Sequence, residues 1–204
     1  MSEGRHLLLF SGFLGSGKTT VIVPLAKAVA ASGRRVAVVV NEIGEIGIDN
    51  QFMRHLGLSV RELVAGCMCC TLAGDLIKTL EKLDTEYAPD IALIEASGAA
   101  DPKSVLSALP YYHGKGFSDA RVTTLVDPLR LPMLMEIMTP LITSQIRHAD
   151  VAIISKADMA TKEEIEFART TIGEINPNAP CLVFGKGGAS EREELASELL
   201  PWPI

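Results

Sequence analysis

The chain has 204 residues, of which 48% are hydrophobic and 5% aromatic, and 19 Lys and Arg against 25 Asp and Glu give a formal net charge of -6. This composition is typical of a soluble folded protein, and the length predicts a single domain over residues 1–204. The acidic balance and the absence of a Lys/Arg-rich run exclude nucleic acid as an expected partner. The longest mostly apolar stretch, residues 129–142, contains charges and prolines, and a membrane span needs about 18–20 uninterrupted apolar residues. No membrane association is expected.

The N-terminus does not predict a secretion signal, because glycines and a lysine within residues 12–18 interrupt the apolar run 7–10. Three of the four cysteines are crowded into residues 67–70. Disulfides that stabilise a scaffold are normally spread along the chain. We therefore expect reduced thiols and a cytoplasmic protein.

Short runs rich in Val, Ile and Leu alternate with longer helical segments along the chain. The runs, which are typical of strands buried on both faces, are residues 7–10, 36–40, 91–94, 122–126, 151–154 and 182–184. The expected helices are residues 18–31, 74–83, about 129–138, and 161–175. This alternation predicts an α/β fold, a doubly wound and mainly parallel sheet flanked by helices.

Local signals refine the ends of some elements. Thr161, with Glu163 and Glu164 two and three residues later, is expected to cap its helix. Residues 111–116 are interpreted as a mobile loop, and residues 185–188 as a loop before a capped helix that starts near Ser190.

The most specific motif is the loop G-x-x-x-x-G-K-T at residues 12–19, directly after an apolar strand and before a helix. Glycines let the backbone wrap around phosphates, and the helix adds its positive end. Lys18 is expected to bind the β- and γ-phosphates and Thr19 to ligate Mg²⁺. The nucleotide-binding residues predicted here are Gly12, Gly15, Ser16, Gly17, Lys18 and Thr19. The alternative is a glycine-rich turn without a ligand.

A second motif, Ser155-Lys156-Ala157-Asp158, follows the apolar run 151–154. P-loop GTPases carry Asn-Lys-x-Asp at this place, and the carboxylate of Asp158 can accept hydrogen bonds from the guanine N1–H and N2–H₂. Adenine lacks that donor pair, so Asp158 should select guanine. Ser155 in place of Asn removes an amide that would brace the base. The alternative is a solvated turn with Asp158 as a surface acid.

Glu95 follows the strand 91–94 and precedes Gly98 by three residues. Ligands of α/β folds bind at the carboxyl ends of the strands. Glu95 is therefore expected to hold Mg²⁺ through water or to orient the attacking water, and Gly98 to sense the γ-phosphate. The predicted catalytic residues are Lys18, Glu95 and Gly98, and the alternative for Glu95 is a structural ion pair.

Cys67, Cys69 and Cys70 place three thiols within four residues, too close for a disulfide of good geometry but suited to one soft cation. Zn²⁺ fits such ligands best, with a fourth position left for another group, while Co²⁺, Ni²⁺ and Cu⁺ also tolerate thiolates. An open position suits metal transfer. The alternative is that the three cysteines pack in a core.

Residues 41–49 combine three acids with two glycines after the strand 36–40. We interpret them as a flexible acidic loop. Asp49 is a candidate Mg²⁺ ligand, and Glu42 and Glu45 are candidate oxygen ligands near the nucleotide or the thiolates. The alternative is a solvated loop without a specific role.

Taken together, these motifs resemble the CobW branch of the SIMIBI P-loop GTPases, relatives of the HypB and UreG nickel-insertion proteins. The resemblance runs from residue 7 to Asp158 and extends to about Pro180. It rests on residues 12–20, which add Thr20 to the nucleotide site, and on residues 41–49, 66–70, 95–98 and 155–158. Its most specific element is the C-x-C-C cluster at this distance after the phosphate loop.

The resemblance implies a GTP-dependent metallochaperone that binds GTP or GDP with Mg²⁺ and a transition metal. Hydrolysis, slow without a partner, would be coupled through residues 42–70 to loading or release of the metal for a client metalloprotein, cobalamin-related systems included. The resemblance also allows a homodimer, although no stripe in the sequence indicates one.

Two features depart from the family pattern. One is Ser155. The other is that longer members carry a C-terminal domain, often histidine-rich, whereas this chain ends at Ile204 and has four histidines. Two other classes of function stay open, namely an ATP-dependent small-molecule P-loop kinase and a non-catalytic nucleotide-binding regulatory module.

Overall fold

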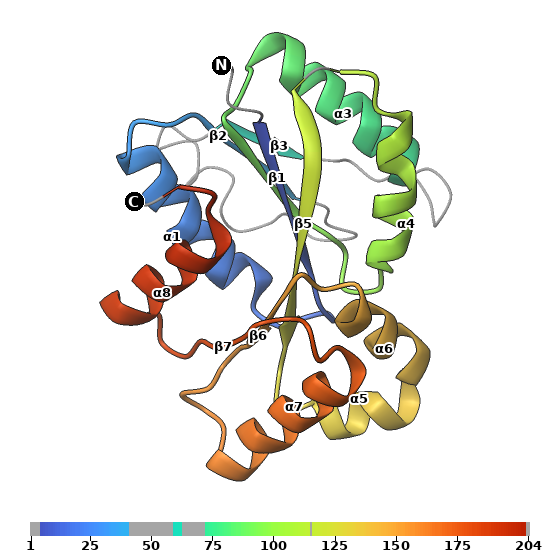
Figure 1. Ribbon diagram of the computed structural model, residues 1–204, viewed down its shortest axis with the longest axis vertical. Helices are drawn as coiled ribbons and strands as arrows, with labels where there is room; N and C mark the ends of the chain where they lie inside the picture. Colours follow the sequence, from blue (N-terminus) through green and yellow to red (C-terminus); the bar gives the residue numbers. More distant parts are fainter. Residues whose placement is uncertain (1–4, 41–58, 63–71, 115, 203–204) are drawn as a thin grey trace.

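The computed structural model describes residues 5–40, 59–62, 72–114 and 116–202, and seven strands among them form one sheet (Figure 1). Their order across the sheet is β3-β2-β4-β1-β5-β6-β7, and each adjacent pair is parallel. The bounds are β1 Arg5–Ser11, β2 Val36–Val40, β3 Ser59–Glu62, β4 Ile91–Glu95, β5 Phe117–Val126, β6 Val151–Ile154 and β7 Cys181–Val183. The predicted parallel sheet is confirmed.

Helices cover both faces of the sheet. They are α1 Lys18–Ala31, α3 Leu72–Glu86, α4 Pro102–Ala108, the 3-10 turn η1 Leu109–Tyr111, α5 Leu131–Ile137, α6 Thr139–Arg147, α7 Lys162–Ile175 and α8 Ala189–Leu199. One face packs on α1 and α8, and the other packs on α3 and α4 at one end and on α5 to α7 at the other (Figure 1). This is the doubly wound arrangement expected from the sequence.

Alternating side chains of the strands supply the two cores. In β1, Leu8 and Phe10 point to the α1 face, whereas Leu7 and Leu9 point to the α3 face. All four are almost fully buried. Because both faces are covered, the central strands carry uninterrupted apolar runs rather than an alternating pattern.

The strand register aligns the carboxyl ends of the strands at one edge of the sheet. Phe10 of β1 lies beside Glu95 of β4, and Val40 of β2 lies on the other side of Glu95. On the opposite flank, Val126 of β5 pairs with Ile154 of β6. Three predicted motifs follow these strand ends in the chain, namely the phosphate loop, the Glu95–Gly98 segment and the Ser155–Asp158 segment. The register therefore gathers these three motifs at a single edge.

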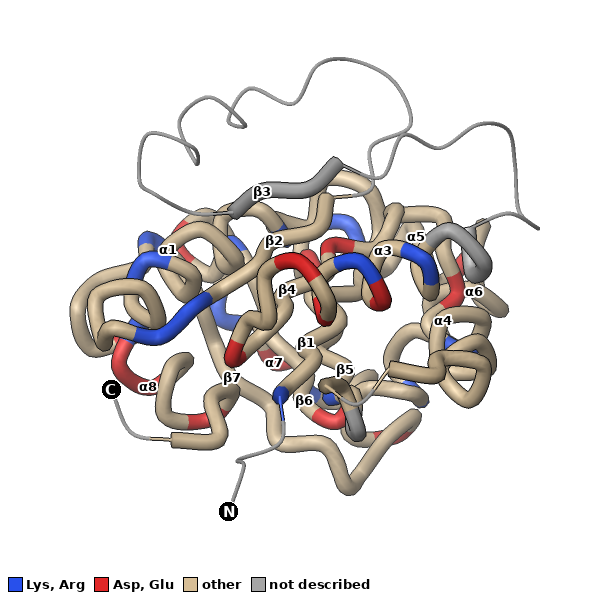
Figure 2. Tube along the Cα trace, turned by 90° about the horizontal axis from the view of Figure 1, so that it is seen from above, with Lys and Arg blue, Asp and Glu red and all other residues tan. Residues whose placement is uncertain are grey.

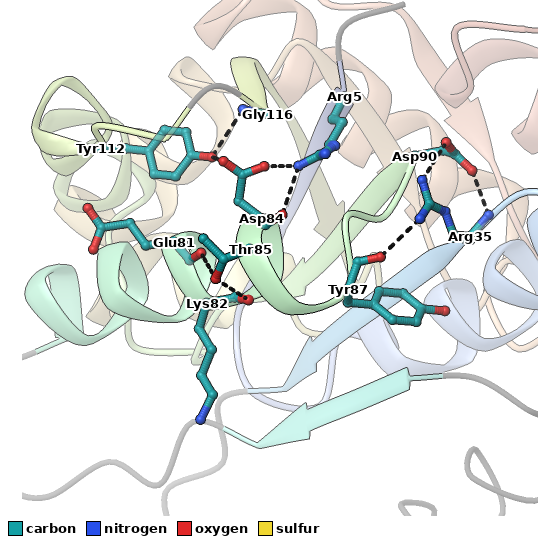
Figure 3. Close-up of polar contacts among 10 residues, drawn as sticks. All are labelled: Arg5, Arg35, Glu81, Lys82, Asp84, Thr85, Tyr87, Asp90, Tyr112 and Gly116. Carbon is teal, nitrogen blue, oxygen red and sulfur yellow. Dashed lines mark hydrogen bonds and ion pairs between the residues drawn. The ribbon is translucent and has the colours of Figure 1, made fainter.

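At the opposite edge, polar contacts fix the segment that was expected to be a mobile loop. The hydroxyl of Tyr112 donates to Asp84 Oδ2 at 2.9 Å and accepts from the backbone N–H of Gly116 at 3.3 Å (Figure 3). Asp84 also forms an ion pair with Arg5 at the start of β1. These contacts tie the segment to α3 and β1, so the described part of it is anchored.

The ends of α7 and α5 bear on two further local predictions. Thr161 caps α7 through a capping box with Glu164, as expected. The predicted helix near 129–138 is the shorter α5, and a separate helix, α6, follows it at once. The sequence did not predict β3, α4 or α6.

Charged residues of both signs are interleaved along α3 and the neighbouring turns (Figure 2). Lys82 and Glu86, one turn apart on α3, form an ion pair of 3.7 Å. Among the described residues, no helix combines the length and apolar character that a membrane crossing requires.

Candidate functional site

The phosphate loop joins β1 to α1 in a conformation that needs glycine. Gly12, Gly15 and Gly17 have φ angles of +130°, +73° and +88°. At Gly12 a Cβ atom would also lie 2.4 Å from the carbonyl oxygen of Leu125 in β5. The loop can therefore press against β5 only because this residue has no side chain.

Lys18 folds back over this loop. Its ammonium donates to the carbonyl oxygens of Gly12 at 2.9 Å and Phe13 at 3.3 Å, and the residue is buried. Burial lowers the pKa of Lys18, and the Glu95 carboxylate opposes that shift. The cation is thus held at the loop by two neutral acceptors, which phosphate oxygens can replace.

Thr19 and Glu95 meet at the start of α1 and the end of β4. The Thr19 hydroxyl donates to Glu95 Oε2 at 2.9 Å and lies 3.1 Å from Oε1. A hydroxyl and a carboxylate are hard oxygen donors of the type that Mg²⁺ prefers. The pair therefore fits a magnesium site, and the structure brings together two of the three residues predicted as its ligands.

The segment after Glu95 rests on the tip of the phosphate loop. A Cβ atom at Gly98 would lie 2.3 Å from the backbone nitrogen of Leu14. The buried amide of Gln145 in α6 donates to the carbonyl oxygens of Gly98 at 3.3 Å and Ala100 at 3.1 Å. Gly98 thus lies beside the phosphate loop, and the hydrogen bond from Gln145 holds its carbonyl group in place.

The Ser155–Asp158 segment follows β6 on the other flank of the phosphate loop. The Ser155 hydroxyl donates to the carbonyl oxygen of Val126 at 3.2 Å, and the residue is buried. Asp158 is exposed, and Gly185, after β7, approaches it so closely that a Cβ atom there would lie 3.0 Å from the Asp158 nitrogen. The carboxylate is therefore accessible to a ligand, while Ser155 anchors its loop to β5.

A groove of about 770 Å³ opens beside the start of α1. Its lining includes Thr19, Thr20 and further residues of α1, residues of α8, and Phe184, Lys186 and Gly187, which follow β7. Its size is within the range of small-molecule pockets. Space for a ligand thus adjoins the phosphate loop and the segment that follows β7.

The remaining predicted ligands lie outside the described residues. These are Asp49, the acidic pair Glu42 and Glu45, and the three cysteines Cys67, Cys69 and Cys70. Within the described ranges, no group of three or more His, Cys, Asp or Glu side chains is arranged to hold a metal ion.

Three residues at the site escaped the sequence analysis, namely Asp127, Arg130 and Gln145. Asp127 is a buried acid directly after β5, so the strand-end rule that selected Glu95 applies to it equally. Arg130 donates to the carbonyl oxygen of Leu14 at 2.7 Å. That contact, like those of Gln145, joins residues far apart in the chain and has no local sequence signal.

Comparison with known proteins places this geometry in a family. Residues 6–183 match the family described as CobW/HypB/UreG, nucleotide-binding domain. The zinc chaperone YeiR of Escherichia coli (strain K12) is 35% identical over 76% of this chain and 47% of its own length. The zinc-regulated GTPase metalloprotein activator 1 of Schizosaccharomyces pombe is 32% identical over 92% of this chain and 47% of its own. The chain therefore spans about half the length of these curated relatives.

A solved structure supports the same fold. The hydrogenase maturation factor HypB from Archaeoglobus fulgidus superposes with a TM-score of 0.70 at 19% identity, covering 96% of this chain and 89% of that one. At this identity the likeness shows a shared fold. The match over residues 6–183, together with the phosphate loop and its partners Lys18, Thr19 and Glu95, shows that the chain belongs to the CobW/HypB/UreG family of P-loop nucleotide-binding domains.

Proposed function

We propose that this chain binds and hydrolyses GTP at the carboxyl edge of its sheet and uses the nucleotide state to control a transition metal that is passed to a client metalloprotein. The observation that carries the proposal is the convergence of Lys18, Thr19 and Glu95 at one point. A buried cation, a hydroxyl and a carboxylate at a helix N-terminus are the parts that a magnesium–triphosphate complex requires.

Thr19 and Glu95 would hold Mg²⁺, with Asp49 as a further candidate ligand. The bound ion would supply positive charge to the β- and γ-phosphate oxygens. Lys18 exchanges its contacts with the Gly12 and Phe13 carbonyls for phosphate oxygens, which keeps the ammonium charged.

Hydrolysis then needs an oriented water and a stabilised γ-phosphate. Glu95, through its carboxylate, orients the attacking water, and the backbone N–H of Gly98 faces the γ-phosphate as it leaves. The water oxygen bonds to the γ-phosphorus, the bond from that phosphorus to the GDP oxygen breaks, and the water proton passes to the inorganic phosphate formed. Because the chain supplies position and charge alone, slow turnover is expected without a partner.

The base site favours guanine. Asp158 is exposed, and its carboxylate can accept hydrogen bonds from both the N1–H and the N2–H₂ of guanine. Adenine lacks this pair of donors. The hydroxyl of Ser155, which replaces the usual Asn, donates to the carbonyl oxygen of Val126. Ser155 therefore braces the loop against β5, and the carboxylate of Asp158 remains for the base.

The metal proposal rests on the cysteines and on the relatives. Thiolates of Cys67, Cys69 and Cys70 suit Zn²⁺, with Co²⁺ and Ni²⁺ as alternatives and Glu42 and Glu45 as candidate oxygen ligands. Two relatives are named a zinc chaperone and a zinc-regulated GTPase metalloprotein activator. In the chain, both ligand segments follow strands, β2 and β3, that end at the same edge as β4. Contact of the γ-phosphate with the segments that carry these ligands would couple the two sites.

The experiment that tests the nucleotide proposal is competition of GTP and ATP for the same site, with multiple-turnover phosphate release measured with and without Mg²⁺, in the presence and in the absence of Zn²⁺. We expect GTP to bind more tightly and the release to depend on Mg²⁺. Asp158→Asn should weaken GTP binding and favour xanthosine triphosphate, whose C2 oxygen accepts where guanine donates. Preference for ATP would support a small-molecule kinase instead, and tight binding without any phosphate release would support a regulatory module.

A further inference from the structure

The turn between β5 and α5 contacts both nucleotide loops. It begins at Asp127 and ends at Arg130, and two backbone hydrogen bonds close it, from the N–H groups of Arg130 at 3.2 Å and Leu131 at 3.0 Å to the carbonyl oxygen of Asp127. A charged side chain therefore leaves each end of a closed four-residue turn, and the separation between the two ends is fixed.

At its first end, the turn holds the base loop. The carboxylate of Asp127 is 3% exposed and accepts from the Lys156 ammonium at 2.6 Å. Its other oxygen accepts from the backbone N–H of Leu129 at 3.1 Å. Lys156 has a φ angle of +53°, a conformation that a side-chain-bearing residue keeps only when its surroundings impose it. The ion pair with a buried acid is a contact of that kind.

At its other end, the turn holds the phosphate loop. Arg130 Nη1 donates to the carbonyl oxygen of Leu14 at 2.7 Å, and its guanidinium carbon lies 5.4 Å from the centre of the Phe13 ring. A Cβ atom at Gly15 would lie 3.3 Å from the same nitrogen. The guanidinium thus lies against three consecutive residues of the phosphate loop, Phe13 to Gly15.

We propose that Asp127 and Arg130 are positioning residues that hold the base loop and the phosphate loop at the spacing of one nucleotide. Asp127 acts on the base through Lys156, and Arg130 acts on the triphosphate through Leu14. This inference rests on the proposed nucleotide site and adds to it a division of roles between the two ends of one turn.

The division of roles predicts different responses to a ligand that has no base. Asp127→Asn and Lys156→Met should each weaken GDP and GTP binding about tenfold, while magnesium tripolyphosphate binds as it does to the unchanged chain. The double variant should be no weaker than either single one, because both remove the same contact. Arg130→Ala should weaken GTP and tripolyphosphate together and lower kcat, and Arg130→Lys should restore part of each.

The matched control is Glu198→Gln, which removes a carboxylate from an ion pair of 2.7 Å with Arg121, in the middle of β5. Glu198→Gln should change the binding of neither GTP nor tripolyphosphate, and thermal unfolding should show that every variant folds. Equal weakening of GTP and tripolyphosphate by Asp127→Asn, or no weakening of either, would overturn the inference while wild-type GTP binding upholds the proposed function. Absence of GTP binding to the wild-type chain would overturn both.

Discussion

The Thr19 hydroxyl lies 2.9 Å from one carboxylate oxygen of Glu95 and 3.1 Å from the other, although 76 positions separate the two residues in the chain. The parallel pairing of β1 with β4 creates this contact, because it places Glu95 beside Phe10, just before the phosphate loop. The strand pairing thereby brings two oxygen donors together from distant parts of the chain.

Replacement of Glu95 tests whether this pair is catalytic. Glu95→Gln keeps an amide oxygen for the Thr19 hydroxyl but removes the negative charge, so we expect GTP hydrolysis to fall about 100-fold while the fold is retained. Multiple-turnover phosphate release measures the effect. The control is Glu86→Gln on α3, which removes a carboxylate paired with Lys82 far from the site. Equal rates for Glu95→Gln and the wild type would show that Glu95 is structural.

The contact between Gly98 and Leu14 predicts that an added methyl group disrupts the site. In Gly98→Ala the new Cβ would lie 2.3 Å from the Leu14 nitrogen, so one of the two loops must shift. We expect the free energy of unfolding to fall by about 1–3 kcal/mol and hydrolysis to fall with it.

The matched substitution is Gly173→Ala in α7, where nothing lies within 4 Å of the added atom. There the unfolding free energy should rise by about 0.5–1 kcal/mol, because alanine favours the helix. Chemical denaturation of both variants gives the comparison, and a neutral Gly98→Ala would contradict the close approach of the two loops.

The anchored segment at the far edge of the sheet makes a prediction about stability alone. Tyr112→Phe removes the hydroxyl that links Asp84 to Gly116, and we expect a loss of about 1–2 kcal/mol in unfolding free energy. Tyr111, its neighbour, is 71% exposed, so Tyr111→Phe should have almost no effect. Equal effects of the two substitutions would indicate that the hydrogen bonds of the Tyr112 hydroxyl do not stabilise the protein.

Cys181 predicts a dependence of stability on pH. Burial raises the pKa of its thiol, and the positive charge of Arg169 opposes the shift. Above about pH 8.5 the unfolded chain therefore loses the thiol proton while the folded chain retains it. The unfolded state binds fewer protons in this window, so the free energy of unfolding falls as pH rises through it.

This pH dependence is measured by urea unfolding of the variant Cys67→Ser/Cys69→Ser/Cys70→Ser, with and without Cys181→Ala. The alkaline loss should vanish when Cys181 is replaced, and identical slopes would refute its origin in this thiol. The same raised pKa makes Cys181 slow to react with iodoacetamide at neutral pH. Cys181 should therefore contribute little to metal binding in titrations of the intact chain.

The sequence predicted those parts of the structure that have a local physical signature. The buried strands had apolar runs, and α7 had a capping box at Thr161 and Glu164. In contrast, β3 has one apolar residue, Val60, among its four, and α4 and α6 are short helices with Pro102 and Pro140 in their first turns. Their formation depends on packing against the sheet, which no local pattern records.

The candidate site divides in the same way. Lys18 and Asp158 belong to motifs with fixed spacing, so the sequence alone indicated their roles. Arg130 and Gln145 act through carbonyl oxygens of Leu14 and Gly98, and such contacts follow from the strand order. Residues of this second kind become visible only when the sheet is assembled.

In the proposed function, nucleotide state controls metal affinity. The direct measurement is a titration of Co²⁺ and Zn²⁺ into reduced protein loaded with GDP or with a non-hydrolysable GTP analogue, following thiolate-to-cobalt absorption, with Cys69→Ser as the variant. We expect tight binding that depends on Cys69 and differs between the nucleotides by about tenfold, which corresponds to about 1.4 kcal/mol of coupling. Equal affinity in the two nucleotide states would contradict it, because a ligand that binds both states equally shifts neither.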